Sequence, residues 1–162
     1  MKTIILLNGP SSSGKSTLSK TLQKLLKDHH QSYEIVDIDD YMKIATDETI
    51  YEDDVFEISN DMNTAVKEYL KDHDGVIVSH VITSERIYVE FLNVAKDYKL
   101  IKVHVSCPLK VLLNREKERG NRCKGSAKDS YTYLYPKKGY DMTIDTSKTT
   151  LEENTLKILK VI

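Results

Sequence analysis

Cysteine is scarce in this sequence: Cys107 and Cys123 are the two thiols among 162 residues. Their spacing fits neither a CxxC redox pair nor a zinc site, and two thiols cannot form a disulfide framework. Without such a framework, a reduced and cytoplasmic location is the natural expectation.

Long apolar runs and a surplus of one charge are also missing. No stretch approaches the ~18 consecutive apolar residues of a membrane span, and the first apolar run, Ile4–Leu7, is too short for the core of a signal peptide. The formal net charge of −1 gives no electrostatic attraction to nucleic acid or to an anionic membrane. We therefore expect a soluble protein with neither of these partners.

Strand-like and helix-like segments alternate along the chain. Apolar or β-branched runs predict strands at 4–7, 33–38, 75–82, 100–106 and 140–145. Apolar residues at helical spacing predict helices between them, capped at Asp53 or Asp54, at Ser84 and at Thr150. Residues 121–139 lack a clear period and are interpreted as a mobile loop with about one helical turn. The alternation predicts an α/β fold: a doubly wound, mainly parallel five-stranded sheet with helices on both faces.

A glycine- and serine-rich segment follows the first predicted strand and matches the pattern G-x-x-x-x-G-K-[ST]. The glycines permit backbone angles that let consecutive N–H groups point at phosphate oxygens. Lys15 can reach the β- and γ-phosphates of a nucleotide, and the Ser16 hydroxyl can join Mg²⁺. The pattern therefore predicts a site for a nucleoside triphosphate and Mg²⁺, with Ser16 as metal ligand, formed by Gly9, Pro10, Ser11, Ser12, Ser13, Gly14, Lys15, Ser16 and Thr17.

Three aspartates, Asp37, Asp39 and Asp40, follow the second predicted strand. The carboxyl ends of parallel strands converge on the ligand crevice of a doubly wound sheet, and alternation sends Asp37 and Asp39 to the same side. A carboxylate there can accept the proton of an attacking hydroxyl or bind Mg²⁺ through water. The alternative is that Asp40 caps the next helix and Asp37 is solvated. We predict Asp39 as the catalytic residue.

Arginines frame the start of the 121–139 segment. Arg115 and Arg119 are four residues apart and share a helix face, and Arg122 follows closely. Guanidinium groups beside a mobile segment can stabilise charge on a transferring phosphoryl group. Arg119 and Arg122 are predicted catalytic residues, whereas the sequence does not decide between a functional and a solvated Arg115.

With these residues identified, the chain resembles the chloramphenicol phosphotransferase-like family of small P-loop kinases. The resemblance covers most of the chain in outline and is densest at Ile5–Thr17, around Asp39 and at Val105–Ser147. Residues 115–122, read as R-E-K-E-R-G-N-R, match the family's lid segment R-E-x-x-R-G-[DN]-R. Two differences stand out: Ser79-His80 replaces an acidic pair common in the family, and Tyr41–Lys71 matches no antibiotic-binding segment.

The resemblance implies a kinase that transfers phosphate from ATP to a hydroxyl of a small molecule. It assigns the catalytic aspartate to Asp39, the phosphate-binding lysine to Lys15 and the lid arginines to Arg119 and Arg122. We expect a single P-loop kinase domain over residues 1–162, with a mobile lid at about 119–139. The alternatives are a nucleotide or polynucleotide 5′ kinase and a nucleotide-binding module without catalysis. The acceptor, the preferred purine and the oligomeric state, a homo-oligomer included, stay open.

Overall fold

The computed structural model describes residues 1–42, 51–120 and 125–162 of the chain. In this part five strands form one sheet in the order β2-β3-β1-β4-β5, and every neighbouring pair is parallel. The predicted parallel five-stranded sheet is thus confirmed. The strands are β1 (Thr3–Asn8), β2 (Tyr33–Asp37), β3 (Gly75–His80), β4 (Lys99–Ser106) and β5 (Met142–Asp145).

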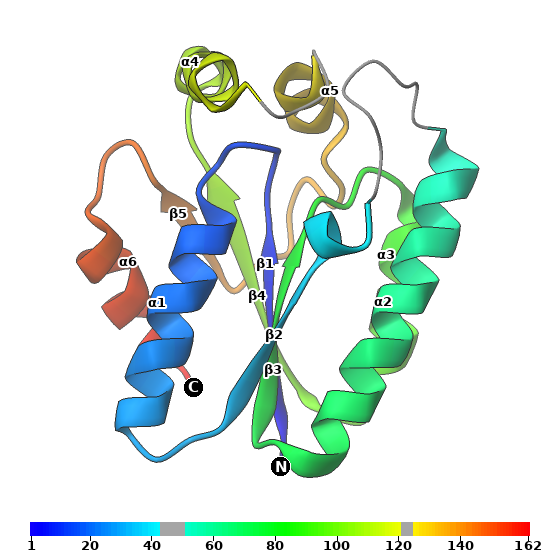
Figure 1. Cartoon of the computed structure of the whole chain (residues 1–162), viewed down its shortest axis with the longest axis vertical. Helices are drawn as coiled ribbons and strands as arrows, with labels where there is room; N and C mark the ends of the chain where they lie inside the picture. Colours follow the sequence, from blue (N-terminus) through cyan, green and yellow to red (C-terminus); the bar gives the residue numbers. More distant parts are fainter. Residues whose placement is uncertain (43–50, 121–124) are drawn as a thin grey trace.

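Helices cover both faces of the sheet (Figure 1). α1 (Lys15–Asp28) and α6 (Leu151–Leu159) pack on one face, and α2 (Glu52–Asp72) and α3 (Glu85–Ala95) pack on the other. α4 (Leu109–Arg119) and α5 (Ser126–Tyr133) lie beyond the carboxyl edge of the strands, above the loop that follows β1 (Figure 1). No helix in the described part of the chain is long and apolar enough to cross a membrane.

β1 occupies the centre of the sheet and is buried on both faces. Ile4 and Leu6 join the core beneath α2 and α3, whereas Ile5 and Leu7 join the core beneath α1 and α6. All four side chains have 0% of their surface exposed. The uninterrupted apolar run of the sequence follows from this double burial, since a strand covered on both faces has no polar side.

Two of the three predicted helix caps are confirmed. The hydroxyl of Ser84 accepts the N–H of Ile87 at the start of α3, and that of Thr150 accepts the N–H of Glu153 at the start of α6. The prediction for α2 is wrong, because this helix begins at Glu52 and has no side-chain cap. Asp53 and Asp54 lie in its first turn, where acidic residues favour the positive end of the helix dipole.

The stretch interpreted as a loop with about one turn contains α5, a helix of 8 residues. Its buried residues, Ala127 and Ser130, are both small. A helix that buries so little apolar surface needs no apolar stripe, so this segment shows no helical period of apolar residues in the sequence. The predicted lid at about 119–139 includes residues 121–124, which lie outside the described part.

Candidate active site

The loop after β1 has a backbone that depends on its two glycines. A Cβ atom on Gly9 would lie 2.1 Å from the carbonyl oxygen of Val105 on the neighbouring strand. Gly14, which precedes α1, has a φ angle of +99°, a region that side chains disfavour. The loop therefore presses against β4 at its start and turns sharply into the amino end of α1.

The side chain of Lys15 lies inside this loop and is 7% exposed. Its ammonium donates to the carbonyl oxygens of Gly9 at 2.9 Å and Pro10 at 2.8 Å, and to Ser13 Oγ at 3.3 Å. The loop thus surrounds a positive charge with its own main chain, next to the amino end of a helix that also favours anions.

Asp37 contacts Ser16, the loop residue that follows Lys15. The hydroxyl of Ser16 donates to Asp37 Oδ2 at 2.7 Å, and the other carboxylate oxygen accepts the N–H of Asp39 at 2.9 Å. Asp37 ends β2 and is 7% exposed, so the alternative in which it is solvated is wrong. Asp37 is not among the site residues predicted from the sequence, although its position at a strand end makes it a possible ligand of Mg²⁺.

Asp39 lies two residues beyond Asp37, the last residue of β2, in the short 3₁₀ turn Ile38–Asp40. Its side chain is partly buried and lines the same cavity as Lys15 and Ser16. Asp40, by contrast, is exposed. The structure therefore brings together two of the three aspartates, Asp37 at the loop and Asp39 at the cavity wall.

Arg115 braces the outside of the loop from α4. Its guanidinium donates to Thr146 Oγ1 at 2.9 Å and to the carbonyl oxygens of Ser12 and Ser13, each at 3.3 Å. Thr146 in turn donates to Ser13 O at 2.7 Å. Arg119, one turn along α4, is exposed and lines the cavity, whereas Arg122 lies outside the described residues.

Lys15, Ser16, Asp39, Arg115 and Arg119 line one cavity of about 580 Å³. This volume is typical of small-molecule sites. Asp39 and Val81, which follow β2 and β3, line its wall together with residues that follow β5. Because β2 and β5 are the two edge strands, the cavity runs along the carboxyl edge of the sheet with the loop between its ends. Its lining beyond β5 comes from Thr146, Thr149, Leu151 and Asn154.

The strand end at Ser79-His80 carries no carboxylate. His80 is fully buried, and burial, together with the positive charge of Lys15, lowers its pKa to about 3. Its Nδ1 accepts the N–H of Val81 at 2.9 Å, so the neutral ring carries its proton on Nε2. A neutral imidazole adds no second positive charge beside Lys15.

No cluster of three or more His, Cys, Asp or Glu side chains able to hold a metal ion occurs within the described ranges. The oxygen atoms that converge on the loop are those of Ser16 and Asp37. A hydroxyl and a carboxylate are ligands suited to Mg²⁺, which typically completes its shell with water and substrate phosphates.

The sequence matches the family described as "Chloramphenicol phosphotransferase-like protein" over residues 2–162. The chain belongs to this family. No protein in a search of curated sequences matches it. The family resemblance inferred from the loop, Asp39 and the arginines of residues 115–122 is therefore confirmed.

Solved structures similar to this chloramphenicol phosphotransferase-like chain share the P-loop kinase fold at low sequence identity. The APS kinase of Mycobacterium tuberculosis, solved with AMPPNP and APS, is 16% identical with a TM-score of 0.77, covering 99% of this chain and 96% of that one. A gluconokinase from Sinorhizobium meliloti is 18% identical, with a TM-score of 0.70 and coverage of 98% and 90%. The tunicamycin resistance protein of Deinococcus radiodurans is also 18% identical, with a TM-score of 0.65 and coverage of 99% and 95%.

Proposed function

We propose that this chain is an ATP-dependent phosphotransferase that phosphorylates a hydroxyl of a small molecule and uses Mg²⁺. The hydrogen bond between Ser16 and Asp37 is the observation that supports this most. It brings a hydroxyl and a carboxylate together at the residue that follows Lys15, in a cavity that Asp39 also lines. A loop that only bound phosphate would not need two carboxylates at its side.

The triphosphate of ATP binds the loop from Gly9 to Thr17 in this proposal. Lys15 has three N–H donors, and the carbonyls of Gly9 and Pro10 accept the two shorter bonds. The bond to Ser13 Oγ, at 3.3 Å, is the longest of the three and the easiest to exchange for a phosphate oxygen. The carbonyls thus hold the ammonium in the loop while it contacts the substrate.

Ser16 and Asp37 fit a magnesium ion, since both offer hard oxygen ligands at the edge of the loop. When bound, Mg²⁺ neutralises charge on the β- and γ-phosphates. Asp37 also orients the Ser16 hydroxyl by accepting its hydrogen bond, which leaves the oxygen lone pairs of Ser16 directed away from the carboxylate.

Asp39 accepts the proton of the attacking hydroxyl, because it lines the cavity at the end away from β5. Arg119, and Arg122 by its resemblance to the family's lid, stabilise charge on the phosphoryl group as it moves. Arg115 keeps the loop in shape through its bonds to Ser12 and Ser13. The single kinase domain and the lid at about 119–139 stay part of this proposal.

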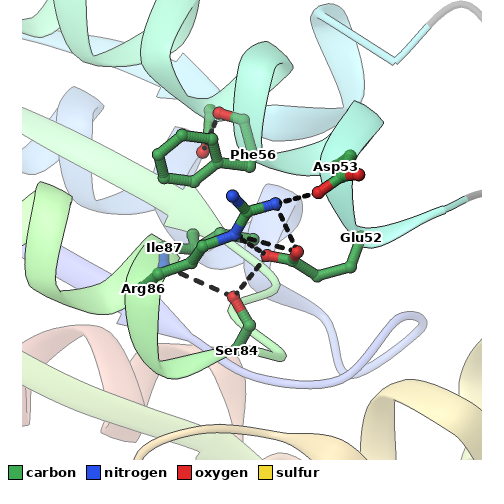
Figure 2. A network of polar contacts seen from close by, with 7 residues as sticks. Glu52, Asp53, Phe56, Ser84, Arg86 and Ile87 are labelled. Carbon is green, nitrogen blue, oxygen red and sulfur yellow. Dashed lines mark hydrogen bonds and ion pairs between the residues drawn. The ribbon is translucent and has the colours of Figure 1, made fainter.

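We place the acceptor beside the amino ends of α2 and α3, at the carboxyl edge of the sheet, where the charges around Arg86 favour an uncharged molecule. Figure 2 shows the Arg86 guanidinium held by Glu52 and Asp53 over the ring of Phe56, whose centroid lies 4.1 Å from Cζ. Arg86 is the basic residue of α3, and the lysines of α2, Lys67 and Lys71, lie in its second half. Within the described residues, the amino ends of these helices therefore offer little unpaired positive charge for a nucleotide or sugar acid.

The experiment is an ADP-release assay with neutral alcohols and with nucleoside monophosphates as acceptors. Lys15→Ala and Asp39→Asn should each lower acceptor-dependent turnover by about 10²-fold or more, whereas Asp40→Asn, an exposed neighbour, should not. Undiminished turnover in Asp39→Asn would remove the assigned base. Transfer to nucleoside monophosphates supports the nucleotide kinase instead. ATP binding without transfer or hydrolysis supports a binding module.

A further inference from the structure

A hydrogen bond joins the phosphate-binding loop to α5, a helix to which the proposed function assigns no catalytic side chain. The main-chain N–H of Ser11 donates to Ser130 Oγ at 2.9 Å. Ser130 is 7% exposed, and its hydroxyl donates a hydrogen bond to Ser126 O within α5 at 2.6 Å. The oxygen of Ser130 is therefore left as an acceptor for the loop.

The same peptide unit that contacts Ser130 also contacts Lys15. Its carbonyl, Pro10 O, accepts from Lys15 Nζ at 2.8 Å, on the opposite edge from the Ser11 N–H. The N–H and C=O groups of a planar trans peptide point in opposite directions. Holding the Ser11 N–H therefore helps to orient the Pro10 carbonyl, which also accepts the N–H of Ser13 at 3.3 Å. If this peptide plane turned over, an N–H group instead of an oxygen would face the ammonium.

α5 itself is held in place independently of the loop. Glu116 Oε1, on α4, accepts the N–H of Ala127 at 3.0 Å, in the first turn of a helix whose N-cap Gly125 provides no side-chain cap. Ala127 is fully buried against Cys107 and Leu112. Packing and the contact with α4 thus hold Ser130 in place independently of its bond to the loop.

We propose that Ser130 is a positioning residue for Lys15, which acts through the peptide unit between Pro10 and Ser11. By accepting the Ser11 N–H, it keeps the Pro10 carbonyl turned toward the ammonium and so keeps the ammonium at the place of the triphosphate. This inference rests on the proposed function in one respect, namely that Lys15 binds the phosphates of ATP.

The test compares Ser130→Ala with Thr132→Ala on the same helix. Thr132 is exposed, and its hydroxyl donates to Lys128 O within α5 at 2.8 Å. In Ser130→Ala the amide of Ser11 should exchange with solvent faster, and the calorimetric Kd of ATP with Mg²⁺ should rise about three- to tenfold, the factor that one lost hydrogen bond corresponds to. Ser130→Thr, which keeps the hydroxyl, should restore both, and Thr132→Ala should change neither.

The two readouts separate this inference from the proposed function. Unchanged Ser11 exchange in Ser130→Ala overturns the contact, and faster exchange with an unchanged Kd overturns its effect on Lys15. Wild-type protein that binds no ATP refutes the proposed function instead, while the exchange measurement still tests the contact. If the alanine variant does not fold, Ser130→Cys, which is close in shape and a weaker acceptor, should give the same direction in both readouts.

Discussion

Replacing Asp37 by asparagine removes one charge from the end of β2 and keeps the shape of the side chain. The oxygen that accepts the Asp39 N–H at 2.9 Å remains available. The new amide faces Ser16 Oγ, which then accepts a hydrogen bond instead of donating one at 2.7 Å. Because both contacts survive, we expect the free energy of unfolding to change by less than about 1 kcal/mol.

The binding of Mg²⁺ should change far more than the stability. Loss of a residue that ligates the metal or orients its ligand typically weakens metal affinity about 10- to 100-fold, or roughly 1.4–2.8 kcal/mol. The affinity for ATP in the presence of EDTA should not fall, since the variant removes a negative charge near the phosphates. ATP titrations by calorimetry at a series of Mg²⁺ concentrations, and in EDTA, measure both effects.

Two further variants test whether the change in Mg²⁺ binding comes from the Asp37 carboxylate itself. Asp40→Asn removes an equal charge from an exposed neighbour in the same turn and should leave the dependence on Mg²⁺ unchanged. Asp37→Ala also removes the acceptor for the Asp39 N–H, so it should lose about 1 kcal/mol of stability in addition. An Asp37→Asn protein with the wild-type dependence on Mg²⁺ would show that Asp37 takes no part in binding the metal.

Two other predictions concern stability. Gly9→Ala places a Cβ 2.1 Å from Val105 O, so it should lower the free energy of unfolding in urea by about 1–3 kcal/mol; an unchanged urea midpoint would contradict the close packing of the loop. His80, with its pKa lowered from 6.5 to about 3, takes up its proton in the unfolded chain first, so stability should fall as pH drops from about 6.5 toward 3. The wild-type slope should exceed that of His80→Gln by up to about 1.4 kcal/mol per pH unit, and equal slopes would rule out a neutral buried His80.

Local sequence was sufficient to predict the strands, the glycine-rich loop and two helix caps. β1 is a wholly apolar run because both of its faces are buried, so four consecutive residues identify it. The caps at Ser84 and Thr150 are bonds between residues three apart, which a short pattern can specify. The glycines of the loop are likewise fixed by their spacing to Lys15.

Contacts between distant residues could not be predicted in the same way. Ser16 and Asp37 are 21 residues apart, Arg115 and Ser12 are 103 apart, and Ser11 and Ser130 are 119 apart. Each depends on the order of strands in the sheet or on where a connecting helix returns. The sequence does not decide whether Arg115, in a run of charged residues, is solvated or functional, and the two small buried residues of α5 give no apolar period.

If Asp37 binds Mg²⁺ as proposed, the strand order also accounts for the absence of an acidic pair at Ser79-His80. β2 lies beside β3, and Asp37 is the register partner of Ser79. Neighbouring parallel strands are about 4.8 Å apart and end at the same edge, so a carboxylate on β2 reaches the loop from nearly the position that one on β3 would occupy. His80, kept neutral by burial, adds no positive charge there to offset it. The carboxylate of Asp37 therefore has no substitute on β3, and its removal should affect the metal more than in a site with an acidic residue on both strands.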